Sequence, residues 1–328
     1  MVTILDVARL AKVSPSTVSH ALSGKRSISP ATKERIFSAI DSLGYVPSRN
    51  ASNLRTGTSG IIGCYTADIT EGFTIRIIKG IEQGLAGSNL SMLLVSGIEF
   101  EDDFSRAYKF LRSYNIDGLL VCHHFSSIFN PYDNIEIPVA VINMTQKGLK
   151  SIMTDNYGGG VIAADHLVSS GMKKPAMICG PRNRLAVKHR LAGFSKRLKK
   201  LGLDFPPDHY LYGTYFYEHG YEASYELIRR DPAIDGFFCI NDRVAAGAIN
   251  RLTGMGYRIP DDIRILGYDN CDFSPFWNIP ISTIDIPLEK MGFLGINALR
   301  NAISTGVNDS GHEILQPMLI ARASTCHP

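Results

Sequence analysis

The chain has 328 residues, of which 45% are apolar and 20% charged, and its formal net charge is +3. This length exceeds one ordinary hydrophobic core and predicts two or three domains, and the composition is that of a globular protein. No apolar run approaches the ~18 residues of a membrane-spanning helix, and the first residues lack the pattern of a secretory signal peptide, so we expect a cytoplasmic protein without membrane contact.

Positive charge is concentrated at the start of the chain. Residues 1–58 contain eight Lys or Arg and three Asp or Glu, a net charge of +5, which leaves −2 for the remainder. A small basic head on a nearly neutral body favours a polyanion as the partner of the head. A solvated helical face would carry the same charge, so charge alone does not decide between the two.

Three short helices are predicted within this basic head. Thr3, Ser14 and Ser29 are good N-cap residues, each directly before a helical segment, and Gly44 is a good helix terminator. Apolar residues spaced i, i+3, i+4 and i+7 predict one buried face for the first helix. Because only a tight turn separates the first two helices, the segment predicts a helix-turn-helix unit, whose second helix enters the major groove of DNA with its N-terminus first.

The outer face of the second helix carries small polar residues. Ser16 and His20 are four residues apart and share this face, with Thr17 beside them. Small side chains let the backbone approach base edges, His20 can donate to or accept from a base, and Arg26 can bridge O6 and N7 of guanine. We therefore predict DNA contacts by Ser14, Ser16, Thr17, His20 and Arg26. The alternative is a plain three-helix bundle whose outer face is only solvated.

A family resemblance favours the DNA-binding interpretation. The stretch TILDVARLAKVSPSTVSHALSG is similar to the head of the lactose-repressor/galactose-repressor (LacI/GalR) family of bacterial transcription regulators, with the pattern T-I-x-D-V-A-x-x-A-x-V-S-x-x-T-V-S-x-x-L. The following LGYVPSRNASNLRTGTSGIIG resembles the family's link through a hinge helix into a regulatory body. The resemblance implies a helix-turn-helix domain (1–47), a hinge helix and linker (48–59), and an effector-binding and dimerisation domain (60–328).

The hinge helix of the family inserts a leucine into the minor groove at the operator centre. The resemblance places Leu54 at that position, followed by Arg55. An isolated helix of about nine residues is marginal in water, so we expect it to order on DNA, where an apolar wedge between base steps bends the duplex. The alternative is a linker leucine packed on its own domain. His20 and Ser52 depart from the family, because many members have arginine at those two positions.

Beyond Gly60, apolar strand-like runs alternate with helical segments, which predicts parallel sheets in an α/β body. These runs are 60–66, 91–97, 117–122, 138–143, 175–180, 235–242 and 263–270. The resemblance implies two lobes similar to periplasmic sugar-binding proteins, with a ligand in the cleft between them. We assign 60–156 and 287–328 to the first lobe and 157–286 to the second.

Several polar and aromatic residues stand near the carboxyl ends of these runs, where open parallel sheets bind ligands. The resemblance implies that five of them line the effector cleft, namely Phe73, Arg190, Tyr215, Asn241 and Asp269. Arg184 is the sixth residue that we predict there, and Asn143 is a weaker candidate. A guanidinium or a carboxylate can hold two neighbouring sugar hydroxyls, and an aromatic ring can cover an apolar sugar face. The alternatives are a surface cation for Arg190, a turn cap for Asp269 and core packing for Phe73.

The sequence contains no pattern of a catalytic or metal centre. Its six cysteines are far apart and form no Cys-x-x-Cys pair, which favours buried thiols in a reducing compartment. Adjacent His123 and His124 would point to opposite faces of a strand. Because P-loop and Gly-x-Ser-x-Gly motifs are also missing from the sequence, we expect no metal, no cofactor and no enzymatic activity.

Together these features predict a ligand-responsive, sequence-specific DNA-binding regulator, which we expect to be a repressor. We expect a homodimer on a near-palindromic double-stranded operator, because no leucine heptad follows the last strand-like run. A sugar is the favoured effector, since Ala186 stands where some purine-binding members have a threonine. A purine or another metabolite is the alternative, because Arg184 matches a position that some purine-binding relatives use. A solute-binding or enzymatic α/β module is the second hypothesis.

Overall fold

The computed structural model describes residues 2–23, 26–46, 58–66, 68–69, 72–97, 104–122 and 135–326. The chain forms two compact units, Met1–Ser59 and Gly60–Pro328. The predicted hinge residues Leu54 and Arg55 lie outside the described residues, as does most of the hinge segment 48–59.

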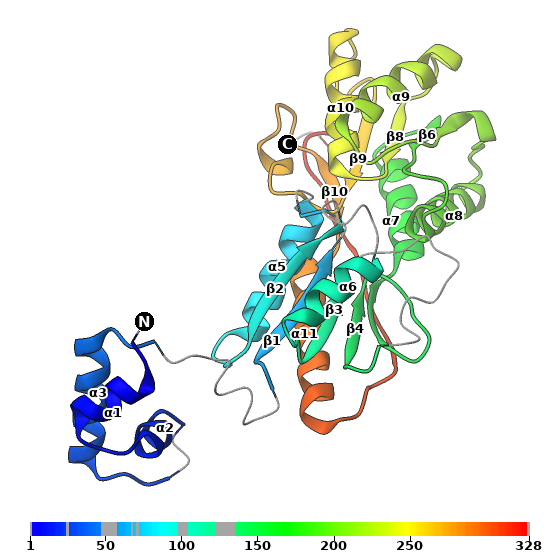
Figure 1. Ribbon diagram of the computed structural model, residues 1–328. Coiled ribbons are helices and arrows are strands. Elements are labelled where there is room, and N and C mark those ends of the chain that lie inside the picture. Colours follow the sequence, from blue (N-terminus) through cyan, green and yellow to red (C-terminus); the bar gives the residue numbers. More distant parts are fainter. Residues whose placement is uncertain are drawn as a thin grey trace. The chain divides into compact units, whose positions relative to one another are not determined.

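The described part of the first unit contains three helices in the predicted places, α1 (Ile4–Ala11), α2 (Pro15–Ser23) and α3 (Pro30–Leu43) (Figure 1). At the start of α1, the Asp6 carboxylate accepts hydrogen bonds from the Thr3 amide and hydroxyl. At the start of α3, Ser29 Oγ accepts a hydrogen bond from the backbone of Thr32. Lys12 adopts a left-handed φ of 54° and makes the turn into α2. The apolar helix faces enclose a core of Val7, Ala8, Ala11, Val18, Ala21, Ile36 and Ala39.

The first lobe of the second unit is built on a six-stranded parallel sheet in the order β11-β5-β4-β3-β1-β2. Its strands are β1 (Ile61–Thr66), β2 (Ser91–Ser96), β3 (Gly118–Val121), β4 (Val139–Ile142), β5 (Lys150–Thr154) and β11 (Gly311–Leu315). Helices α5 (Gly72–Leu85) and α11 (Leu288–Thr305) pack on one face, and α6 (Phe104–Ser113) packs on the other. Gly80 lets α5 and α11 touch, because a Cβ on Gly80 would overlap the backbone of Glu289.

The second lobe repeats this plan with the strand order β12-β10-β9-β8-β6-β7, in which only the edge strand β12 is antiparallel to its neighbour. Its strands are β6 (Pro175–Ile178), β7 (Tyr210–Leu211), β8 (Gly236–Cys239), β9 (Arg264–Tyr268), β10 (Ser282–Asp285) and β12 (Met318–Ile320). The helices pack in two pairs, α7 (Asn156–Ser169) with α8 (Leu185–Lys200) and α9 (Tyr217–Arg230) with α10 (Asp242–Gly254) (Figure 1).

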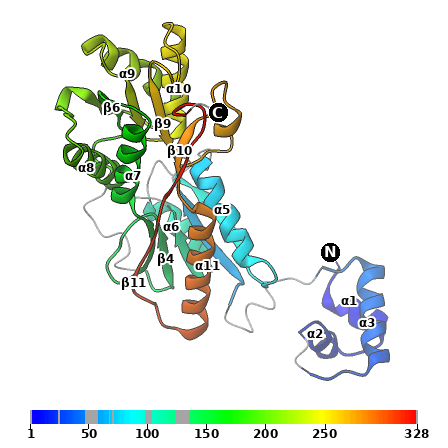
Figure 2. The same cartoon turned by 180° about the vertical axis from the view of Figure 1, so that it is seen from behind.

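The chain returns to the second lobe at its C-terminal end, which differs from our assignment of all of 287–328 to the first lobe. After β11, the segment drawn in red crosses to the other sheet (Figure 2). There β12 pairs with β10. The Ser324 amide donates to the Pro280 carbonyl, and the Ser324 carbonyl accepts from the Ile265 amide. The reason is that β10 has an open edge whose backbone groups need partners, and the last strand satisfies them.

Candidate functional site

A cavity of about 230 Å³ lies between the two lobes at the carboxyl ends of their strands. Its walls include Thr66 at the end of β1, Asn143 just after β4, Asn241 after β8 and Asp269 after β9. In each sheet the first strand along the chain lies between the second and the third, so the strand order reverses there. Such a switch point leaves a crevice between the loops, which is where open α/β sheets hold ligands.

The structure brings all six residues predicted for the cleft to the walls of this one cavity. They are Phe73, Arg184, Arg190, Tyr215, Asn241 and Asp269. They come from different elements of both lobes, and they meet because parallel strands present their carboxyl ends at the same edge of a sheet.

Arg190 of α8 is buried, with 6% of its surface exposed, which excludes the surface-cation alternative. Its Nε donates to Asn156 Oδ1 at 2.9 Å, and its Nη1 donates to the Ile240 carbonyl at 2.7 Å. Its Nη2 lies 3.6 Å from Asp269 Oδ1, and its guanidinium carbon lies 3.4 Å from the centre of the Tyr268 ring. Arg190 therefore ties α7, α8 and the ends of β8 and β9 together around the cavity.

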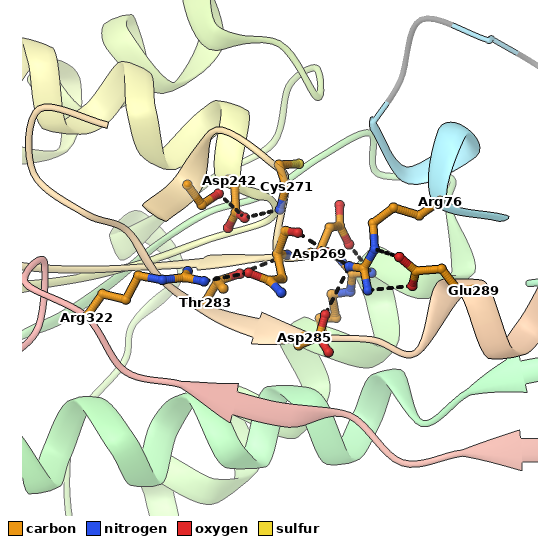
Figure 3. A network of polar contacts seen from close by, with 11 residues as sticks. Arg76, Asp242, Asp269, Cys271, Thr283, Asp285, Glu289 and Arg322 are labelled. Carbon is orange, nitrogen blue, oxygen red and sulfur yellow. Dashed lines mark hydrogen bonds and ion pairs between the residues drawn. The ribbon is translucent and has the colours of Figure 1, made fainter. Parts of the chain in front are cut away.

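Asp269 carries the carboxylate of the cavity wall. Burial raises the pKa of its carboxyl group, while the charges of Arg190 and Arg76 oppose this rise. Its Oδ1 is buried, accepts no hydrogen bond from any described residue and faces the Arg190 guanidinium at 3.6 Å. The turn after β9 is not capped by Asp269, because the Cys271 amide donates to Asp242 Oδ2 at 2.8 Å instead (Figure 3).

Asp242 is the buried support of this turn. The side chain is fully buried, and its Oδ2 also accepts a hydrogen bond of 2.6 Å from Ser274. Burial raises the pKa of Asp242 to about 7, against the opposing hydrogen bonds from Ser274 and Cys271. Asp242 therefore holds the loop that carries Asp269 without lining the cavity itself.

Asn241 and Tyr215 are linked to each other on the second lobe. Asn241 Oδ1 accepts from the Val244 amide at 2.9 Å and so caps α10, while its Nδ2 donates to the Tyr215 carbonyl at 3.0 Å. A carboxamide has two N–H donors, so one further donor remains for a ligand. Gly180 lets the Tyr215 ring lie against the end of β6, because a Cβ there would overlap the ring.

Charge on the cavity wall is mainly positive. Among the residues that the structure describes, Arg184, Arg190 and Arg243 line the cavity together with one carboxylate, that of Asp269. Arg184 is the N-cap residue of α8, and the first turn of this helix also faces the cavity. Phe73 lies in the first turn of α5 and is half-buried.

Sequence reasoning missed Arg243 and Asn156 as wall residues. Arg243 directly follows Asn241-Asp242 at the end of a predicted strand, and this position could have indicated a wall residue. Asn156 lies just after β5, a strand that we did not predict.

The start of α2 presents a cluster of three hydroxyl groups. Ser14 Oγ lies 2.7 Å from Ser16 Oγ and 2.8 Å from Thr17 Oγ1, and it accepts a hydrogen bond from the Thr17 amide. Ser14, Ser16 and Arg26 are exposed, while Thr17 and His20 are half-buried. The predicted outer face of α2 is therefore accessible at its N-terminal end and less so at His20.

The described residues contain no group of three His, Cys, Asp or Glu side chains that could hold a metal ion. Within the same residues, no helix is long and apolar enough to cross a membrane.

Two family models match the chain. The model described as "Bacterial regulatory proteins, lacI family" matches residues 3–48, and the one described as "Periplasmic binding protein-like domain" matches residues 164–325. The HTH-type transcriptional repressor PurR of Haemophilus influenzae (strain PittEE) is 31% identical over 99% of this chain and 98% of its own length. A PurR repressor of Histophilus somni (strain 129Pt) is 30% identical, over 99% of each chain.

Solved structures with the same fold include two that cover nearly the whole chain. The transcriptional regulator CelR in complex with cellobiose is 27% identical, with a TM-score of 0.72 over 99% of this chain and 100% of that one. The lac repressor dimer bound to operator and the anti-inducer ONPF has a TM-score of 0.86 and 24% identity over 99% of each chain, and this likeness concerns the fold.

Proposed function

The chain belongs to the lacI family of bacterial regulatory proteins, and on that premise we propose that a small molecule in the interlobe cavity controls its binding to DNA. As a member of this family, the chain is a DNA-binding transcriptional repressor. The observation that carries the proposal is the convergence of six side chains from both lobes on one cavity. A ligand that contacts both lobes binds some of their mutual orientations better than others, and it thereby shifts the population toward those orientations.

The proposed effector is a sugar. The carboxylate of Asp269 and the guanidinium of Arg190 lie side by side and can hold neighbouring hydroxyls, and Phe73 and Tyr215 offer rings for an apolar sugar face. The relative CelR was solved with cellobiose, which supports the same class. A purine is the second candidate, because Arg184, at the position that some purine-binding relatives use, is part of the wall.

The proposed DNA-binding state is a cytoplasmic homodimer on a near-palindromic operator. Each head would place the start of α2 in the major groove, with Ser14, Ser16, Thr17, His20 and Arg26 toward the DNA. The segment with Leu54 and Arg55 would order at the centre of the operator. Coupling between effector and operator is typically ~1–3 kcal/mol per site, so operator affinity should change by about 5- to 150-fold.

The first experiment selects duplexes from a random library with the purified full-length chain at one stated salt concentration, since phosphate contacts make affinity salt-dependent. Enrichment of a near-palindrome is the expected result. Failure to enrich any sequence, both with purified protein and with cell extract added, would refute sequence-specific binding. The enriched duplex then serves as the probe, with cellobiose and hypoxanthine as trial effectors.

Asp269→Ala is expected to abolish the response of duplex binding to the active effector while leaving duplex binding itself in place. The reason is that Asp269 supplies the carboxylate among the described wall residues and is not part of the head. Asp272→Ala is the matched control, because Asp272 is an exposed aspartate near the same turn. A retained response in Asp269→Ala would remove Asp269 from the binding site.

A further inference from the structure

Arg76 of α5 is a partly buried arginine that bonds to both lobes. Its Nε and Nη2 donate to the two carboxylate oxygens of Glu289 at 2.9 and 2.8 Å. Its Nη1 donates to Asp285 Oδ1 at 2.9 Å and to the Asp269 carbonyl at 2.7 Å, with the Asn270 carbonyl 3.4 Å away. Figure 3 shows the guanidinium between these partners. Only 12% of the side chain is exposed.

The first half of this arrangement belongs to the first lobe. Glu289 lies in the first turn of α11, and α11 packs against α5 with backbone contacts at Gly80 and Gly292. The backbones of α5 and α11 therefore lie in close contact, and the Arg76–Glu289 pair adds a side-chain link between the same two helices. A planar guanidinium bonded through two parallel N–H groups is also fixed in orientation.

The second half belongs to the second lobe. Asp285 is the last residue of β10, and Asp269 and Asn270 form the turn after β9. Both turn residues have positive φ, 91° for Asp269 and 52° for Asn270, a region that asparagine and aspartate enter more readily than other non-glycine residues. Arg322 Nη2 fixes Asn270 Oδ1 at 2.7 Å from the far side.

The same turn connects the guanidinium to the cavity. The Asp269 carbonyl bonds to Arg76, while the Asp269 carboxylate lies at the cavity wall beside Arg190. Phe73, at the wall on the first lobe, lies three residues before Arg76 on α5. A change at the carboxylate therefore acts on a backbone that the first lobe holds directly.

We propose that Arg76 couples the state of the cavity to the mutual orientation of the two lobes. This inference rests on the proposed function of the cavity as a ligand site. It names the residue through which binding of a ligand changes the orientation of the first lobe. Arg76 is a positioning residue, since it acts through the backbone of Asp269 and does not line the cavity. Burial alone would lower its pKa, but the hydrogen bonds and charges of Glu289 and Asp285 raise it overall, so the guanidinium stays charged at every pH at which the protein is folded.

The test is a double-mutant cycle that needs neither effector nor operator. Lys109→Cys on α6 and Glu222→Cys on α9, both exposed, carry spin labels in a Cys326→Ser background, because the other five cysteines are buried. Pulsed dipolar spectroscopy on full-length chains, diluted with unlabelled chains, measures the distance distribution between the lobes. Asp269→Asn perturbs the cavity wall, and its effect is measured with Arg76 and with Arg76→Lys, which keeps the charge but loses the planar fork.

Arg197→Lys is the matched control, because Arg197 pairs with Asp165 inside the second lobe. We expect Asp269→Asn to shift the mean distance between the two labels in the wild-type and Arg197→Lys backgrounds. In the Arg76→Lys background, the shift should be less than about half of its wild-type size. No shift in the wild type, or an equal shift in all three backgrounds, overturns the inference.

Glu289→Gln provides a second route to the same answer if Arg76→Lys does not fold. It removes the charge that anchors Arg76 to α11, and it should reduce the Asp269→Asn shift in the same way. Because the measurement contains no DNA and no ligand, it stays interpretable if duplex selection or the effector trials fail.

Discussion

Asp242→Asn should change how the stability of the body depends on pH. The wild-type carboxyl group is fully buried and its pKa is raised from 3.8 to about 7 by that burial. The folded state therefore binds this proton more tightly than the unfolded chain does. The resulting stabilisation is complete below about pH 4 and is lost as the pH rises through 7.

The size of this effect follows from the two pKa values. Between pH 5 and pH 8, ionisation of Asp242 should lower the unfolding free energy by about 2.6 kcal/mol. Asparagine has nearly the same shape, keeps an acceptor for the Cys271 amide and the Ser274 hydroxyl, and cannot ionise. The stability of Asp242→Asn relative to wild type should therefore rise by roughly 2–3 kcal/mol over this pH range.

Urea unfolding at pH 5 and pH 8 measures the difference. Trp277 is the single tryptophan of the chain and lies in the body, so its fluorescence follows the unfolding of that unit. Asp272→Asn, an exposed aspartate near the same turn, is the control. If wild type and Asp242→Asn keep a constant difference in unfolding free energy from pH 5 to pH 8, then Asp242 is not the buried titrating group described above.

Two further substitutions test the cavity and the hinge. Arg190→Ala should lower the unfolding free energy of the body by about 3–5 kcal/mol, because it leaves the Asp269 carboxylate buried without its cation. In urea unfolding, the double variant Arg190→Ala/Asp269→Asn should regain part of this loss. Leu54→Ala should weaken binding to the selected operator far more than binding to random duplex in a titration at constant salt, and an equal loss on both would exclude a wedge role for Leu54.

The head and the buried strands could be predicted from the sequence because their signals are local. Capping acts over three positions, since Ser29 accepts a hydrogen bond from the Thr32 amide and Asp6 accepts one from the Thr3 amide. The three helices therefore appear where the sequence indicates. The seven apolar runs are β1, β2, β3, β4, β6, β8 and β9. Six of them are buried at nearly every position, and the edge strand β2 is half-buried. The family resemblance is confirmed by the lacI family model and by the PurR relatives.

Five of the described strands were not predicted, namely β5, β7, β10, β11 and β12. β5 (KSIMT) and β10 (STID) are inner, largely buried strands, but polar residues interrupt their apolar ones, so neither forms a continuous apolar run. β7 has two residues, and β11 and β12 are edge strands with exposed positions such as Ile314 and Met318. The positions of β11 and β12 depend on the open edges of β5 and β10, with which they pair. The amino-acid composition of β11 and β12 does not show that these edges are available. The same reason explains the error at the C-terminus, where β12 joins the second lobe instead of the first.

The sequence by itself determined the family, the helices of the head, seven of the strands that the structure describes and the residue types at their ends, because these depend on spacing along the chain. Only the tertiary structure decided which of those residues act together. Arg76 had no local signal, since its partners Asp269, Asp285 and Glu289 lie 193 to 213 residues away. A buried charge is tolerated where its partners satisfy it, and for Arg76 those partners meet only when the two lobes fold against each other.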